Sequence, residues 1–203
     1  METGSTLLNG KAAVEGQSIQ AGRATDQVVG PDAITLTLQV NGRAMTVVTD
    51  PGATLVQVLR ETLGLTGTKI GCDRGACSAC TVWLDGEVAS SCMTLVLDAR
   101  HRRITTIEGL ADGDTLHPVQ RAFVEHDAMQ CGFCTPGMIM SCAALVERNP
   151  DCTLEDVKAA VSGHLCRCGT YPNVFAATLA AARAKKPKRE AGGDDDLEGR
   201  TGR

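Results

Sequence analysis

The sequence predicts an α+β protein in which a strand-rich half is followed by a helical half. Residues 33–108 contain two strand-turn-strand patterns on either side of one short helical segment. From about Gly109 onward the apolar residues recur with a helical period. Eight of the ten cysteines form two sets of four with different spacings, one set in each half. Each half is therefore expected to be built around its own group of thiolates.

The strand-rich half begins with a β-hairpin. Apolar and polar residues alternate over 34–40, and a second strand is expected at 45–48. The Asn41-Gly42 dipeptide between them is typical of a tight hairpin turn. A second hairpin is expected around Asp85-Gly86, and residues 104–107 can add a last strand.

Between the two hairpins, residues 55–63 carry apolar side chains on one helical face, with Thr54 as N-cap and Gly64 as the stop. A glycine-rich loop at 67–80 holds three cysteines and leads into the second hairpin. Two hairpins around a helix, with a cysteine loop between them, resemble the β-grasp fold of plant-type ferredoxins. We therefore expect a ferredoxin-like domain at residues 33–108.

Four helices are expected in the second half, at 119–128, 136–147, 154–162 and 172–183. Pro136 suits a first helical turn, and Thr153 with Asp156 resembles a capping box. These segments predict a four-helix bundle domain at residues 109–183. Residues 1–32 are predicted to be a disordered extension, and residues 184–203, first basic and then acidic, a disordered tail.

The composition narrows the class of protein. A net charge of −4 and 2% aromatic residues give neither a basic field nor platforms for stacked bases, so no nucleic acid partner is expected. No apolar run approaches the roughly 18 to 20 residues of a membrane span, and no export signal is visible. Many cysteines in a cytoplasmic protein favour metal binding over disulfides. We expect a cytoplasmic metalloprotein.

The first cysteine set consists of Cys72, Cys77, Cys80 and Cys92. Its Cys-x4-Cys-x2-Cys run is the spacing of plant-type 2Fe-2S ferredoxins. The small residues around these cysteines let the backbone wrap an inorganic core closely and donate N–H groups to its sulfurs. A zinc site is the alternative, but zinc sites usually show two short Cys-x2-Cys pairs.

The second cysteine set consists of Cys131, Cys134, Cys166 and Cys168. It forms a Cys-x2-Cys pair and a Cys-x-Cys pair with 31 residues between them, and each pair can direct two thiolates at one metal. From this spacing, an iron-sulfur cluster and a zinc ion both remain open.

The other chemically active residue types show no organised site. Cys142 and Cys152 lie outside both sets and are expected to be buried or idle thiols. The four histidines lack the spacing of a metal or nucleophile site, so each is expected to be a cap or a surface residue. Without a Ser-His-Asp order, a phosphate loop or a carboxylate pair, the chemistry expected of the chain is one-electron transfer.

Four motifs occur in order: GCDRGACSAC at 71–80, TTIEGL at 105–110, QCGFCTPG at 130–137 and CRC at 166–168. With these motifs, residues 34–182 resemble the iron-sulfur subunit of the xanthine oxidase family of molybdenum hydroxylases. The resemblance implies two 2Fe-2S clusters, the second cysteine set holding the one nearer molybdenum and the first set the one nearer FAD. Electrons would then pass from a molybdopterin site through both clusters to FAD.

The same resemblance implies partner chains. Gln130 matches a glutamine that hydrogen-bonds the pterin of the molybdenum cofactor, and Cys168 matches the ligand whose sulfur approaches the pterin amino group. A large molybdopterin-binding subunit and a medium FAD-binding subunit are implied as separate polypeptides, so the chain is not expected to be catalytic alone.

One departure concerns the residues after the last cysteine, where Gly169-Thr170 stands in place of the Thr-Gly of many relatives. This variant resembles bacterial aldehyde and N-heterocycle oxidoreductases more than animal xanthine dehydrogenase. The expected reaction is therefore oxidative hydroxylation of an aldehyde or an N-heteroaromatic ring. A free-standing two-cluster ferredoxin is the alternative, although the modest net charge favours a buried subunit over a mobile carrier. A zinc-binding interaction module is the third hypothesis.

Overall fold

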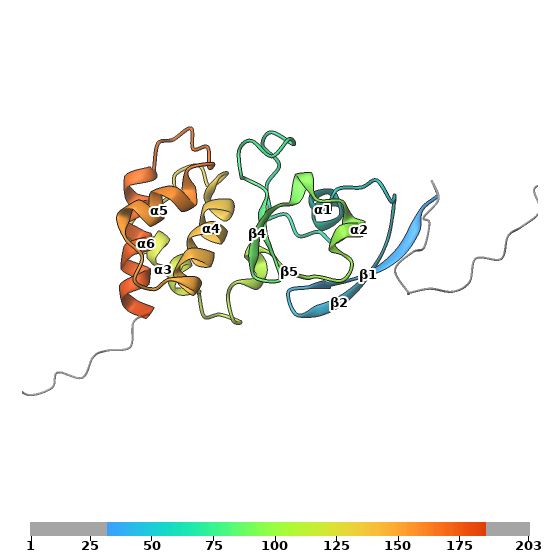
Figure 1. Ribbon diagram of the computed structural model, residues 1–203, viewed down its shortest axis with the longest axis horizontal. Helices are drawn as coiled ribbons and strands as arrows, with labels where there is room; N and C mark the ends of the chain where they lie inside the picture. The colour runs from blue at the N-terminus through green and yellow to red at the C-terminus, as the bar shows by residue number, and fades with distance from the viewer. Residues whose placement is uncertain (1–31, 186–203) are drawn as a thin grey trace, which may run out of the picture. The chain divides into compact units, whose positions relative to one another are not determined.

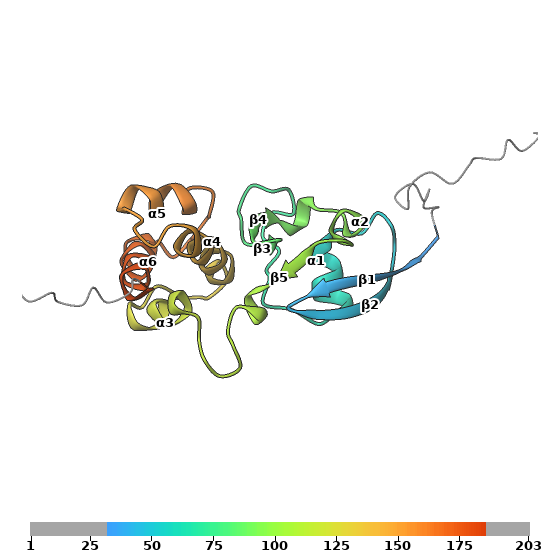
Figure 2. The same ribbon diagram turned by 60° about the horizontal axis from the view of Figure 1, so that its bottom comes forward.

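The computed structural model describes residues 32–185, in which a sheet formed by the first half is followed by four helices in the second half (Figures 1 and 2). The predicted extension at 1–32 and the predicted tail at 184–203 therefore fall almost entirely outside the described residues. Ala184 and Lys185 are an exception, because they form the last residues of a helix rather than the start of a tail.

One mixed sheet occupies the first half. Its five strands are β1 Ile34–Val40, β2 Arg43–Thr49, β3 Thr81–Leu84, β4 Glu87–Ser90 and β5 Arg103–Thr105. The strand order is β2-β1-β5-β3-β4. β5 pairs parallel to β1 and antiparallel to β3, so the last strand in the sequence joins the two predicted hairpins into one sheet.

The hairpin turns form where the sequence predicts them. Asn41 and Gly42 both have positive φ (50° and 74°), as do Asp85 and Gly86 (56° and 90°), which is the backbone of a type I′ turn. Asn41 also contacts β5, since its N–H donates to the Ile104 carbonyl at 2.8 Å. Its side chain binds the residue after β5, where Oδ1 accepts from the Thr106 N–H at 2.9 Å and Nδ2 donates to the Thr106 hydroxyl at 3.0 Å. The first turn is therefore fixed to the middle of the sheet.

The predicted helix between the hairpins is α1 Leu55–Gln57, which continues as the π-helical turn η1 Val58–Thr62. Gly64 follows it with φ 69°, in the conformation that ends helices. The short elements η2 Ser91–Met93, α2 Val96–Ala99 and η3 Ile107–Gly109 were not predicted, because three or four residues are too few to show a period. A core of buried side chains lies between these elements and the sheet: Leu38, Val40, Val47, Leu55, Val58, Leu59, Val82, Leu84, Val96, Ala99 and Ile104.

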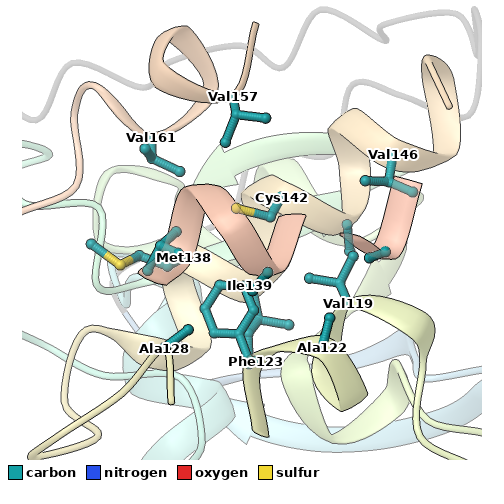
Figure 3. Packing of buried hydrophobic residues seen from close by; sticks show 14 of the residues in the cluster. Val119, Ala122, Phe123, Ala128, Met138, Ile139, Cys142, Val146, Val157 and Val161 are labelled. Carbon is teal, nitrogen blue, oxygen red and sulfur yellow. The ribbon is translucent and has the colours of Figure 1, made fainter. Parts of the chain in front are cut away.

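Four helices make up the second half: α3 Pro118–Glu125, α4 Thr135–Arg148, α5 Leu154–Val161 and α6 Tyr171–Lys185. All four predicted helices are present, with boundaries shifted by up to three residues. They share a second core, in which Phe123 and Cys142 lie among valines and methionine (Figure 3). In the residues described, no helix combines the length and the apolar character needed to cross a membrane.

Helix α4 lies between the two cores. Ten of its 14 residues are buried, because helices cover one face and β3 covers another. The Trp83 Nε1–H of β3 donates to the Met140 carbonyl at 2.9 Å. Gly137 has no side chain where α4 meets the first half, and a Cβ there would collide with the Ser78 carbonyl oxygen. The two halves are therefore in direct contact along α4.

Candidate metal centres

The first cysteine set gathers around one loop. Cys72, Cys77 and Cys80 lie in the irregular segment between η1 and β3, and Cys92 lies in η2. Cys72 is half-buried, whereas the other three are at most 8% exposed. Their thiols meet in two hydrogen-bonded pairs, Cys72 with Cys77 and Cys80 with Cys92.

Backbone N–H groups point at the sulfurs of this loop. The Arg74 and Ala76 N–H groups donate to the Cys72 Sγ at 3.4 and 3.2 Å, and the Gly75 N–H donates to the Cys92 Sγ at 3.3 Å. The loop can turn its amides inward because Gly75 has φ 72°. The sequence prediction that small residues allow backbone donors to face the sulfurs is confirmed here.

These contacts shift the pKa values of the thiols in opposite directions. The Arg74 N–H, helped by the Cys77 thiol and despite some burial, lowers the pKa of Cys72 to about 7. Burial, together with donation to Cys80, raises the pKa of Cys92 to about 11. The Cys72 thiol therefore loses its proton more readily than an ordinary cysteine, and the Cys92 thiol less readily.

The second cysteine set comes from two segments 31 residues apart. Cys131 and Cys134 lie just before α4, and Gly132 between them has φ 80°. Cys166 and Cys168 lie between α5 and α6 in residues 162–170, called here the Cys166 loop. Their thiols again form two pairs, Cys131 with Cys168 and Cys134 with Cys166.

The pKa values of this set also diverge. Burial, and then donation to Cys166, raises the pKa of Cys134 to about 12. Burial would also raise the pKa of Cys166, but hydrogen bonds from the Thr170 hydroxyl and N–H outweigh it and lower that pKa to about 7. The Phe133 N–H, followed by the Cys168 thiol, lowers the pKa of Cys131.

Several side chains that the sequence did not single out fix the Cys166 loop. The Tyr171 hydroxyl donates to the His164 carbonyl at 2.7 Å and accepts from the Cys166 N–H at 2.9 Å. The prediction that every histidine is a cap or surface residue is wrong for His164, which is 5% exposed. Its Nε2 lies 3.0 Å from the Gly137 carbonyl and 3.2 Å from the Ser141 hydroxyl. The Cys166 loop is therefore joined to the first turns of α4.

Burial also lowers the pKa of His164, although the hydrogen bond to the Gly137 carbonyl acts in the opposite direction. A neutral ring suits this position, because a charged imidazole would have to be paired to remain buried. His117, in contrast, is an N-cap as expected, with its Nδ1 accepting from the Val119 N–H at 3.2 Å.

The loops of the two cysteine sets touch each other. The Leu165 N–H donates to the Cys77 carbonyl at 3.2 Å, and the Ser78 hydroxyl donates to the Gly163 carbonyl at 3.1 Å. The hydrogen bond from Leu165 connects a residue of the first set to the residue before Cys166. Sequence spacing gave no sign of this contact, because the partners are more than 80 residues apart.

The remaining predicted residues lie apart from the two thiol clusters or at their edge. Gln130 is exposed just before Cys131, and Cys168 is half-buried. Cys142 and Cys152 are buried, as expected, and belong to neither set. Burial raises the pKa of Cys142 to about 12, despite a hydrogen bond with Thr178, so this thiol is unreactive at neutral pH.

A single zinc ion and a 2Fe-2S cluster need different arrangements of the four sulfurs. In residues 32–185, no three His, Cys, Asp or Glu side chains meet closely enough to mark a site for one metal ion. The sulfurs of each set lie instead in two pairs. A 2Fe-2S cluster takes two cysteines at each of its two irons. The paired sulfurs of both sets therefore fit such a cluster.

Comparison with known families gives two matches that follow one another along the chain. Residues 38–111 match the family described as the 2Fe-2S iron-sulfur cluster binding domain. Residues 106–179 match the family described as the 2Fe-2S binding domain. The first match contains the whole first cysteine set and the second contains the whole second set.

Similar proteins share most of this length. The nicotine 6-hydroxylase small subunit of Paenarthrobacter nicotinovorans is 47% identical over 150 residues, which is 74% of this chain and 90% of that protein. The aldehyde oxidoreductase iron-sulfur-binding subunit PaoA of Escherichia coli (strain K12) is 42% identical over 75% of this chain and 73% of its own length.

Solved structures agree with these matches. The chain is similar to one from quinoline 2-oxidoreductase of Pseudomonas putida 86, with a TM-score of 0.72 and 39% identity over 75% of this chain and 95% of the other. Aldehyde oxidoreductase from Desulfovibrio gigas gives a TM-score of 0.70 and 42% identity, but there the match covers 18% of a longer polypeptide. The chain therefore belongs to the iron-sulfur small subunits of the molybdenum hydroxylases, in which it is the electron-transfer subunit of an oxidoreductase built from several subunits.

Proposed function

We propose that the first and second cysteine sets are the ligands of the two 2Fe-2S clusters of this subunit. The observation that carries the proposal is that the four sulfurs of each set lie in two pairs, although the two sets come from segments of unrelated structure. When bound, each cluster supplies reversible one-electron redox chemistry. Within each set, we assign the two hydrogen-bonded cysteines of a pair to the same iron.

The chain itself would provide the route between the two sites. From Cys166, one peptide bond leads to Leu165, whose N–H donates to the carbonyl of Cys77 at 3.2 Å. This path crosses from the second set to the first through covalent bonds and a single hydrogen bond. Gly137 supports the path because its missing side chain lets α4 pack directly on the Ser78 backbone. The residues of the chain thus hold the two sites in contact.

Two accessible residues at the edge of the second site indicate which partners the chain would contact. Gln130 and Cys168 are accessible at its edge, and we propose that they contact the pterin of a large molybdopterin-binding subunit. The first set would then lie nearer the FAD of a medium subunit. The names of the similar proteins, which include nicotine 6-hydroxylase and aldehyde oxidoreductase subunits, support an aldehyde or N-heteroaromatic substrate.

We further assign residues 33–108 to a β-grasp domain and residues 109–183 to a four-helix bundle domain. Each range contains one of the two hydrophobic cores, and the sheet order β2-β1-β5-β3-β4 supports the first assignment. The proposed location is the cytoplasm, where thiols stay reduced until a cluster is inserted. Fractionation of the native host would test this location.

Metal analysis and purification from the native host test the function. We expect about four irons and four acid-labile sulfides per chain. We also expect the chain to elute together with molybdenum and FAD. A chain that carries four irons but never elutes with either cofactor would instead be a free-standing two-cluster carrier. Zinc without sulfide would contradict both assignments of the cysteine sets.

A further inference from the structure

Thr170 occupies an unusual position at the start of α6. It precedes Tyr171, and its carbonyl accepts from the Asn173 and Val174 N–H groups, so it is the residue at which the helix begins. A threonine there ordinarily uses its hydroxyl to accept a backbone N–H of the first helical turn. Here the Thr170 hydroxyl lies 3.3 Å from the Cys166 Sγ instead.

The direction of this hydrogen bond follows from the chemistry of the ligand. A cysteine that holds iron is a thiolate and has no proton to donate. The Thr170 hydroxyl must therefore be the donor and the Cys166 sulfur the acceptor. Thr170 is only 6% exposed, so little water competes for its hydroxyl and the interaction is stronger than it would be at the surface.

The surrounding backbone holds Thr170 in this orientation. Gly169, with φ 76°, turns the chain back toward Cys166. The Cys166 N–H is already occupied by the Tyr171 hydroxyl, whose own proton is directed to the His164 carbonyl. The donor to this sulfur is thus a side-chain hydroxyl, which a substitution of Thr170 can remove.

We propose that Thr170 raises the reduction potential of the second 2Fe-2S site by donating a hydrogen bond to the Cys166 sulfur, an inference that rests on the proposed function of the second cysteine set. Reduction adds one electron and no proton, and part of the added negative charge lies on the cysteine sulfurs. A hydrogen bond to a charged acceptor strengthens as that charge grows, so the reduced form is stabilised more than the oxidised form. Thr170 therefore makes the site a better electron acceptor.

The test compares two substitutions in the full-length, cluster-loaded chain. Thr170→Val keeps the shape of the side chain and removes the hydroxyl, whereas Thr170→Ser keeps the hydroxyl. Midpoint potentials of both sites are measured by redox titration followed by EPR. Thr170→Val is expected to lower the midpoint potential of one site by about 59 mV, which corresponds to a tenfold change in the one-electron equilibrium constant. Thr170→Ser is expected to keep the wild-type value.

Two control variants identify the site that moves. Cys134→Ser removes a proposed ligand of the second site, so the signal that it abolishes marks the site whose midpoint should shift in Thr170→Val. Thr178→Val also removes a buried hydroxyl from α6, but that hydroxyl donates to the Val174 carbonyl at 2.7 Å. It should leave both midpoints unchanged.

The possible results separate this inference from the proposed function. Two wild-type signals with unmoved midpoints in Thr170→Val, or equal shifts at both sites, would overturn the role of Thr170 alone. If Thr170→Val does not assemble the second site, the smaller Thr170→Ala replaces it. Loss of the signal in both, with retention in Thr170→Ser, would make Thr170 an assembly requirement and also overturn the inference. A wild-type chain with one signal would contradict the proposed function instead.

Discussion

The two cysteine sets reach the same paired arrangement of sulfurs in different ways. In the first set, the donors to Cys72 and Cys92 are backbone N–H groups of a single loop. In the second set, the side chains of Thr170 and Tyr171 contact Cys166 directly. A backbone N–H remains when the side chain of its residue is changed, so the first site depends on the conformation of its loop. The second site also has backbone donors, but it depends in addition on particular side chains and is the one that substitutions can adjust.

The largest effect is expected from a substitution that removes one site and leaves the other in place. Cys134→Ser in the assembled enzyme should abolish one of the two EPR signals of the reduced chain. It should also stop substrate-driven reduction of FAD, because the proposed route runs through the second site. Cys142→Ser is the matched control, since Cys142 is also buried but belongs to neither set. Unchanged FAD reduction in Cys134→Ser would refute the route.

The contact between the two regions is the next feature to test. In Gly137→Ala the new Cβ would collide with the Ser78 carbonyl, and backbone atoms cannot move aside cheaply. We expect a loss of about 2 kcal/mol in the free energy of unfolding, measured by thermal denaturation of the cluster-loaded chain. In Gly52→Ala the nearest atom is the end of the Asp50 side chain at 3.1 Å, so a smaller loss is expected there. Equal losses in both variants would contradict close packing at Gly137.

A third pair of variants compares the two sites directly. Tyr171→Phe leaves the Cys166 N–H and the His164 carbonyl without their shared partner, at a cost of about 1 to 3 kcal/mol. The second EPR signal should therefore decay faster than in the wild type when an iron chelator is added.

Arg74→Ala provides the corresponding change at the first site. It removes a side chain but keeps the N–H that donates to Cys72, so the first signal should decay at the wild-type rate. If Arg74→Ala labilised the first site as much as Tyr171→Phe labilises the second, the contrast between backbone and side-chain support would be wrong.

The smallest expected effect concerns the indole of Trp83. Trp83→Phe keeps most of the apolar side chain and removes the N–H that donates to the Met140 carbonyl. We expect a loss of about 1 kcal/mol, seen as a lower midpoint in chemical denaturation. A loss above about 3 kcal/mol would mean that packing of the larger ring, rather than the hydrogen bond, supports this contact.

Much of the fold could be predicted because its signals are local. Alternating apolar residues and the Asn41-Gly42 turn predict the first hairpin, and the Thr153-Asp156 capping box marks the start of α5. The spacing of the cysteines likewise indicates two separate metal sites. The short helix α2 and the burial of His164 could not be predicted, because neither a four-residue segment nor a lone histidine carries a periodic pattern.

The sequence by itself determined most of the strands and helices and the two sets of four cysteines, since hydrophobic period, turn residues and cysteine spacing all act over a few neighbouring positions. Only the tertiary structure decided which loops meet. The Leu165–Cys77 hydrogen bond and the approach of Gly137 to Ser78 join residues 59 to 88 positions apart. Such contacts depend on how α4 packs against the sheet, and packing of distant surfaces leaves no spacing that can be read along the chain.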